Sequence, residues 1–195
     1  QNIKLFRSIL VGVIEMQNLK IAIVGATGMV GRTFLKVCEE YDLKADYTLL
    51  ASARSAGKKL EFFGKEYEVK ELTEHSFDEG FDIALFSAGG STSEKFSPIA
   101  AAHGCVVIDN SSAWRMDPEV PLVVPEVNPE DIKWNKGIIA NPNCSTIIAL
   151  MAAAPLNRLS RIETMTACTY QAVSGAGQEG LTELMRQTAD VAAGR

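Results

Sequence analysis

Residues 20–40, KIAIVGATGMVGRTFLKVCEE, carry the clearest fold signal in this chain. It begins with Lys20–Val24, a short apolar run with β-branched residues that predicts a buried strand. After a glycine-rich turn, the apolar residues of Met29–Glu40 recur at the spacing of an amphipathic helix. A strand that passes through such a turn directly into a helix is typical of nucleotide-binding α/β domains.

The glycines of this turn, Gly25, Gly28 and Gly31, each suit a physical role. The first permits a tight turn, the second lets the backbone approach a pyrophosphate, and the third lets the helix pack closely. Free N–H groups at the helix N-terminus would hold the pyrophosphate. The spacing GxxGxxG departs from the common GxGxxG, so a glycine-rich turn without a ligand is the alternative interpretation.

Strands and helices alternate along the rest of the chain. The pattern predicts strands at 47–51, 81–86, 106–109 and 137–140, a hairpin turning near Gly64, and helices at 91–102 and 146–159. This alternation predicts an α/β fold with a Rossmann-like, doubly wound and mostly parallel sheet. Further β-branched residues from Ile162, and an amphipathic helix from Gln178 to about Ala193, predict the start of a second, α+β domain.

We therefore divide the chain into three parts. Residues 1–15 are expected to be a leader or extension, because Met16 followed by QNLKIAIVGATG resembles a natural start. Residues 16–159 are expected to form the dinucleotide-binding domain. Residues 160–195 are expected to begin a catalytic and dimerisation domain that is truncated here.

Composition argues against several classes of function. The formal net charge of -5 leaves no dominant basic surface for nucleic acid or an anionic membrane. The apolar run at 9–14 is far too short to span a membrane, and two histidines support no metal site. The four cysteines lack CxxC spacing, so we expect Cys38, Cys105 and Cys168 to be buried free thiols in a reducing, cytoplasmic compartment.

The end of the second predicted strand distinguishes between cofactors. An NAD site places an acid there to bind the ribose 2′-hydroxyl. Asp46 instead precedes this strand, which runs into Ser52, Arg54 and Ser55. A guanidinium flanked by hydroxyl groups suits a 2′-phosphate, so the sequence predicts NADP. A solvated loop charge is the alternative interpretation of Arg54.

Cys144 differs from the other cysteines because it follows the rigid turn Asn141-Pro142-Asn143 and precedes an apolar helix. The N–H groups of a helix N-terminus stabilise a thiolate and a developing oxyanion. A buried thiol is the alternative.

A nucleotide fold with an activated cysteine indicates one chemistry: the thiolate adds to an aldehyde, hydride passes to a nicotinamide, and phosphate releases the thioester as an acyl phosphate. The reverse direction reduces an acyl phosphate to an aldehyde.

Seven ordered motifs resemble those of bacterial-type aspartate-semialdehyde dehydrogenases, from about Asn18 to the end of the chain: GATGMVG, ASARSAGK, ALFSAGGSTS, VIDNSSAWRMD, PLVVPEVN, NPNCST and TYQAVSGAG. The resemblance implies NADP-dependent reductive dephosphorylation of L-4-aspartyl phosphate to L-aspartate 4-semialdehyde through a cysteine thioester. That reaction serves the biosynthesis of lysine (through diaminopimelate), threonine, methionine and isoleucine. The resemblance also implies small-molecule substrates and a homodimer or homotetramer.

The resemblance implies residue roles as well. Cys144 matches the nucleophile and Gln171 the glutamine that orients the substrate. Arg115 and Asn143 match the site for phosphate or the acyl-phosphate group, although a surface salt bridge is the alternative for Arg115. The cofactor contacts map onto Gly25, Thr27, Gly28, Met29, Val30, Arg54, Ser55, Ser87, Ala88, Gly89, Ser174 and Gly175.

Two family residues have no counterpart in this sequence: a general-base histidine and an arginine that grips the substrate carboxylate. His75 and His103 lie outside the matching motifs, so neither is assigned to that role. We therefore expect the 195-residue chain to be inactive alone. The alternatives are N-acetyl-γ-glutamyl-phosphate reductase, where GCY rather than NCS is expected at the nucleophile, glyceraldehyde-3-phosphate dehydrogenase, and a non-catalytic dinucleotide-binding module.

Overall fold

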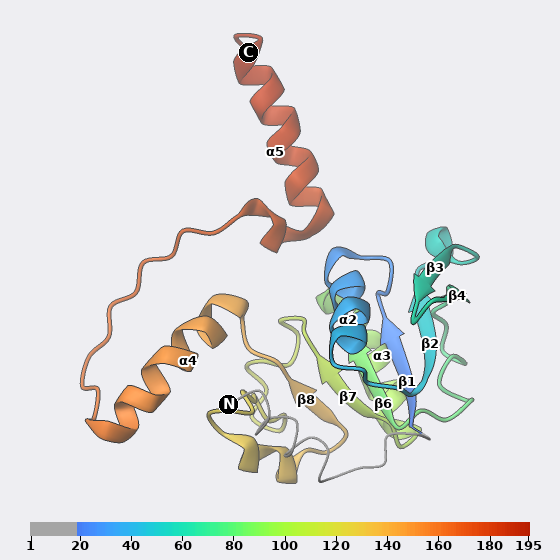
Figure 1. Ribbon diagram of the computed structural model, residues 1–195, viewed down its shortest axis with the longest axis horizontal. Helices are drawn as coiled ribbons and strands as arrows, with labels where there is room; N and C mark the ends of the chain where they lie inside the picture. The colour runs from blue at the N-terminus through green and yellow to red at the C-terminus, as the bar shows by residue number, and fades with distance from the viewer. Residues whose placement is uncertain (1–18) are drawn as a thin grey trace.

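The computed structural model describes residues 19–195 (Figure 1). The expectations for residues 1–15 and for a start at Met16 lie outside these residues. Within them, six parallel strands form the central sheet in the order β5-β2-β1-β6-β7-β8. Their bounds are β1 Lys20–Val24, β2 Asp46–Ala51, β5 Lys70–Glu71, β6 Ile83–Phe86, β7 Val106–Asp109 and β8 Ile138–Ala140.

The remaining elements are an antiparallel hairpin and the helices. The hairpin turns at Phe63 and Gly64, which have positive φ angles of 49° and 66°. Two consecutive residues of this kind fit the twist of a tight hairpin. The bounds are β3 Lys59–Phe62, β4 Lys65–Glu68, α2 Met29–Glu40, α3 Gly90–Ala102, α4 Cys144–Leu159 and α5 Gly177–Ala192, with short 3-10 helices η2 Ala53–Ser55, η3 Pro129–Trp134 and η4 Val173–Ala176.

Both faces of the central sheet are buried. Alternate residues of β1 point to opposite faces, and all four of its residues from Ile21 to Val24 are at most 5% exposed. Ala22 and Val24 belong to the cluster that includes Ala100 of α3. Ile21 and Ile23 belong to the cluster that includes Leu35 of α2. A parallel sheet covered on both faces needs continuously apolar strands, which explains the run from which the fold was predicted.

The strand register aligns the carboxyl ends of the strands at one edge of the sheet. Val24 pairs with Leu50 and Phe86, and Asp109 pairs with Phe86 and Ala140. The chain leaves β1 for β2 on one side and then crosses to β6 on the other. Ligands of doubly wound sheets bind at such a switch point, beyond the carboxyl ends of the strands. The loops after β1, β2, β6, β7 and β8 therefore meet at the edge where a ligand is expected.

Helix α4, the segment 160–172 and helix α5 extend away from the sheet and its covering helices (Figure 1). Neither helix has a buried residue, and Ile148 of the apolar α4 is 73% exposed. The segment 160–172 has no regular secondary structure and leaves Cys168 exposed. The expectation of a buried thiol at Cys168 was wrong, because this segment packs against no sheet in the part of the chain that the structure describes.

The other two structural cysteines, Cys38 and Cys105, are buried as expected. No helix among residues 19–195 has the length and apolar character needed to cross a membrane.

Candidate functional site

The glycine-rich turn after β1 needs its glycines for steric reasons. Gly25 has a φ angle of +85°, and a Cβ atom there would lie 2.4 Å from the carbonyl oxygen of Ser87. A Cβ atom on Gly31 would lie 2.1 Å from the carbonyl oxygen of Gly25. Gly28 is the N-cap residue of α2. The turn therefore packs tightly against both the β6 loop and the first turn of α2, which leaves the N-terminus of α2 open to a ligand.

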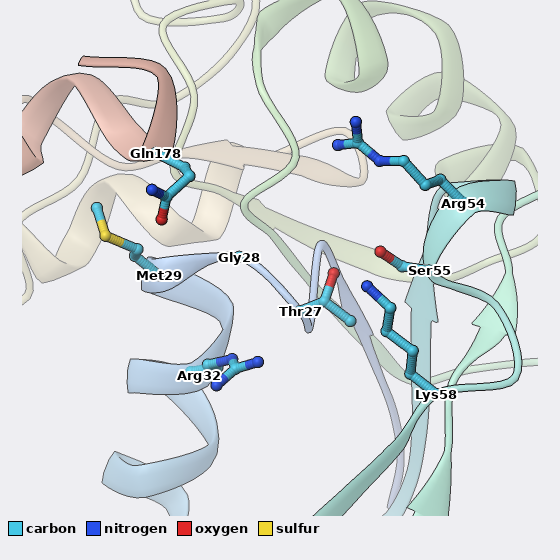
Figure 2. Close-up of a pocket in the computed structure, with 8 residues that line it drawn as sticks. All are labelled: Thr27, Gly28, Met29, Arg32, Arg54, Ser55, Lys58 and Gln178. Carbon is cyan, nitrogen blue, oxygen red and sulfur yellow. The ribbon is translucent and has the colours of Figure 1, made fainter. Parts of the chain in front are cut away.

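A pocket of about 560 Å³ opens at this turn (Figure 2). Its volume falls within the range of small-molecule sites. The start of α2, the loop that begins with η2 and the start of α5 supply its walls, as Figure 2 shows. The lining residues are Thr27, Gly28, Met29, Arg32, Arg54, Ser55, Lys58 and Gln178.

The pocket is cationic. Arg32, Arg54 and Lys58 line it, and its lining includes no acidic residue. None of these three cations takes part in a salt bridge among residues 19–195. Three unpaired cations in a chain of net charge -5 indicate an anionic ligand with more than one charged group.

Five of the predicted cofactor residues line this pocket: Thr27, Gly28, Met29, Arg54 and Ser55. Ser55 is buried and Ser52 is the exposed N-cap residue of η2. Ser174 and Gly175 lie in η4, four and three positions before Gln178 of the lining. The predicted residues outside the lining are Gly25, Val30, Ser52, Ser87, Ala88, Gly89, Ser174 and Gly175.

Sequence reasoning missed two of the pocket cations. Arg32 lies one turn into α2, where its N–H donates to the carbonyl of Gly28. Lys58 follows η2 on the same loop as Arg54. The sequence signal that was available is their place in two motifs. Arg32 ends GATGMVGR, four positions after Gly28, and Lys58 ends ASARSAGK, four positions after Arg54.

Cys144 is the first residue of α4, two residues earlier than the predicted start of that helix. The helix begins there because the side-chain oxygen of Asn143 accepts hydrogen bonds from the N–H groups of Ser145, at 3.0 Å, and Thr146, at 3.4 Å. Cys144 is exposed, and its sulfur lies 3.9 Å from Nε2 of Gln171. The structure therefore brings the predicted nucleophile and the predicted orienting amide together, although 27 positions separate them in sequence.

Arg115 is partly buried in the loop that follows β7. Its Nε atom donates to the carbonyl oxygen of Asn141 at 2.9 Å, and Nη2 donates to that of Asn110 at 3.2 Å. These acceptors are neutral, and Arg115 forms no salt bridge among the described residues. Its charge is uncompensated near the nucleophile loop, as an anion site requires.

The two histidines lie at the opposite edge of the sheet. His103 is the C-cap residue of α3, which runs from the carboxyl edge back to the amino edge. Its Nε2 atom lies 3.1 Å from Oδ1 of Asp78, whose Oδ2 lies 3.1 Å from Nδ1 of His75. Neither histidine therefore reaches Cys144. Among residues 19–195, no cluster of three or more histidine, cysteine or acidic residues could hold a metal ion.

Comparison with known families agrees with this geometry. The family described as "Semialdehyde dehydrogenase, NAD binding domain" matches residues 20–135, more than half of the chain. The chain belongs to the semialdehyde dehydrogenase family. A second family, "Semialdehyde dehydrogenase, dimerisation domain", matches residues 153–195. The first match confirms a nicotinamide-dinucleotide-binding domain over residues 20–135, and the second confirms that a dimerisation domain begins in the C-terminal part of the chain.

Individual relatives carry a more specific name. Aspartate-semialdehyde dehydrogenase from Aquifex aeolicus is 60% identical over 172 residues, which are 87% of this chain and 51% of that protein. The structure of aspartate semialdehyde dehydrogenase II from Vibrio cholerae, complexed with ASA, gives a TM-score of 0.85 at 50% identity. It covers 91% of this chain and 54% of that one. The predicted resemblance and the predicted Rossmann-like fold are confirmed.

A more distant structure is that of aspartate semialdehyde dehydrogenase with NADP from Candida albicans. It gives a TM-score of 0.61 at 26% identity and covers 74% of this chain and 48% of that one. The chain thus spans about half the length of the relatives it matches.

Proposed function

We propose that the protein is an NADP-dependent aspartate-semialdehyde dehydrogenase, to which this chain supplies the cofactor pocket and the nucleophile. The observation that carries the proposal is the arrangement around Cys144. Its sulfur lies at the N-terminus of α4, 3.9 Å from the amide of Gln171, and its loop contacts the Arg115 guanidinium. The cationic pocket lies at the same edge of the sheet. The names of the relatives support the same activity.

The nucleophilic step follows from the position of Cys144. Its thiolate attacks the acyl carbon of L-4-aspartyl phosphate, the bond from that carbon to the phosphate oxygen breaks, and phosphate leaves with the electron pair. A thioester to Sγ remains. When bound, NADPH supplies the hydride that reduces this thioester to the aldehyde level. Cys144 is then expelled as the thiolate and L-aspartate 4-semialdehyde is released.

The neighbouring side chains have distinct proposed roles. Arg115 binds the phosphate group, because a guanidinium with free N–H groups stabilises the charge on the departing phosphate. Gln171 orients the acyl group through the amide that lies beside the sulfur. Asn143 keeps its side-chain nitrogen available for the substrate, while its oxygen caps α4.

NADP rather than NAD is the proposed cofactor because of the residues after β2. Arg54, Lys58 and the hydroxyl of Ser55 line the pocket, and they fit a 2′-phosphate. Asp46 is the first residue of β2 and pairs with Lys20, so it lies at the amino ends of the strands, whereas this pocket lies beyond their carboxyl ends. The Candida albicans relative was solved with NADP. Loss of contacts to the 2′-phosphate should cost roughly 1.5–3 kcal/mol, so titration calorimetry should show clearly weaker binding of NAD.

We also propose that the assembled enzyme is a homodimer or homotetramer in the cytoplasm, without a metal. The domain boundary is placed at residues 159 and 160, where α4 ends. Exposed apolar side chains on α4 and after it support an association through this part of the chain: Ile148, Leu156, Leu159 and Met165. Four free cysteines suit a reducing compartment.

The proposal is tested by NADPH formation from aspartate semialdehyde, phosphate and NADP in the native protein. We expect Cys144→Ala to abolish turnover, and the matched variant Cys168→Ala, which removes another exposed thiol, to retain it. N-acetylglutamate semialdehyde serves as the competing substrate and should give no turnover. Turnover by Cys144→Ala, preference for the competing substrate, or cofactor binding without any turnover in the native protein would each refute the proposal.

A further inference from the structure

Two asparagines extend the contact between neighbouring strands beyond the end of the sheet. Asn110 directly follows β7 and Asn141 directly follows β8. The last backbone contact between these strand ends runs from the Asn141 N–H to the carbonyl of Asp109, at 2.8 Å. Beyond it, the side-chain nitrogen of Asn141 donates to the side-chain oxygen of Asn110 at 2.6 Å, across 31 positions of sequence. The side chains therefore continue the pairing that the backbone no longer provides.

Both asparagines also present their backbone carbonyls to Arg115. Nε binds the carbonyl of Asn141, and Nη2 binds that of Asn110. The amide pair fixes the separation of the two carbonyls, and the guanidinium spans that separation. A guanidinium has five N–H donors, and the hydrogen bonds within residues 19–195 use two of them, which leaves three for an anion. We infer that Asn110 and Asn141 are positioning residues, which hold the guanidinium of Arg115 in place for a phosphate group beside the nucleophile loop.

The surroundings of the pair restrict the loop on the other side of Arg115. The buried carboxylate of Asp109 accepts hydrogen bonds from the N–H of Ser111, at 3.2 Å, and from its hydroxyl, at 2.6 Å. The indole N–H of Trp114 donates to the hydroxyl of Ser93 in α3, at 2.9 Å. The residue next to Arg115 is thus anchored to a helix, while Arg115 itself is anchored to the two strand ends.

This arrangement has an energetic consequence for binding. An arginine side chain loses substantial conformational freedom when it is held in one orientation. If that ordering is already present in the free protein, the anion does not have to bring it about, and binding is tighter. Because Asn141 lies three positions before Cys144, the same pair also ties the anion site to the nucleophile. The inference rests on the proposed phosphate-binding role of Arg115.

The test varies phosphate in steady-state assays of the native protein, in the direction that consumes aspartate semialdehyde. We expect Asn110→Ala and Asn141→Ala each to raise the KM for phosphate by about three- to tenfold, as for loss of one hydrogen bond. The KM for NADP should not change, because the cofactor pocket contains neither residue. Asn135→Ala is the matched control: it removes an asparagine with two loop hydrogen bonds before β8, and should leave both constants unchanged.

A double-mutant cycle with Arg115→Ala separates positioning from general support of the loop. If the pair acts through Arg115, Asn110→Ala should have no further effect on the phosphate KM once Arg115 is removed. An equal effect in both backgrounds would overturn the inference and leave the proposed function intact. An unchanged phosphate KM in Arg115→Ala itself would overturn the role of Arg115 and the inference together. Asn141→Ala breaks the same pair from the other strand, so the cycle can be repeated if one variant fails to fold.

Discussion

Replacing Gly31 with alanine should push the start of helix α2 away from the glycine-rich turn. The added Cβ atom would lie 2.1 Å from the carbonyl oxygen of Gly25 and 2.8 Å from the Cα atom of Ala26. Ordinary contact begins at 3.4 Å, so the start of α2 must move by about 1.3 Å. Both contacts are to backbone, which no side-chain rotation relieves.

The expected loss of stability follows from these distances. Overpacking of this kind costs about 1–3 kcal/mol, and the better helix propensity of alanine returns up to about 1 kcal/mol. The difference spans about 0–3 kcal/mol, so we expect Gly31→Ala to lower the free energy of unfolding by about 1.5 kcal/mol, the middle of this range. Gly90→Ala is the matched control, because a Cβ atom on Gly90, at the start of α3, meets no atom within 4 Å. That variant should be neutral or slightly more stable.

Urea unfolding followed by circular dichroism measures both variants, and NADPH fluorescence measures cofactor binding. Gly31→Ala should bind the cofactor at least about tenfold more weakly, because the N–H groups at the start of α2 move away from the pyrophosphate position. Gly90→Ala should bind as the unmodified protein does. Equal stability and equal affinity of the two variants would refute the account of the turn.

Three further predictions follow from the site. Arg54→Ala should reduce the preference for NADP over NAD by about tenfold or more in titration calorimetry, and an unchanged preference would contradict the assignment of Arg54 to the 2′-phosphate. Lys36→Ala, which removes a cation of α2 outside the pocket, should leave the preference unchanged. Limiting iodoacetamide, read by mass spectrometry, should label Cys144 before Cys168, which is also exposed, and first labelling of Cys168 would count against the helix N-terminus as the activating feature. At pH of about 9 the reagent should still spare Cys105, because burial raises the pKa of that thiol to about 12. The 195-residue chain alone should bind NADP but form no detectable NADPH from aspartate semialdehyde and phosphate, because neither of its histidines reaches the nucleophile. Turnover equal to that of the native protein would show that no further base is needed.

The parts of the fold that the sequence predicted well are set by local patterns. The bounds of β1, α2 and β7 agree with the prediction, because each has a clear hydrophobic period and a glycine or polar boundary. The start of α4 was placed two residues late. The helix starts at Cys144 because the side chain of Asn143 caps it, and the spacing of apolar residues does not show such a hydrogen bond.

The parts of the site that the sequence did not predict depend on contacts between distant segments. Arg32 and Lys58 have the same appearance in sequence as solvated surface charges, and only the fold places them in one pocket. The contact between Asn110 and Asn141 likewise joins two strand ends that are remote in sequence. The error at Cys168 has the opposite cause: its apolar neighbours predicted burial, but every residue of the segment 160–172 is exposed.

The proposed mechanism requires Cys144 to carry the acyl group during turnover. The native protein would be mixed with aspartate semialdehyde and NADP in the absence of phosphate and quenched in acid, and the acyl group would be located by peptide mass spectrometry. We predict one aspartyl thioester, on the peptide that contains Cys144, which disappears when phosphate is added and never forms in Cys144→Ser. A protein that turns over without this thioester, or that carries the acyl group on another residue, would contradict this mechanism.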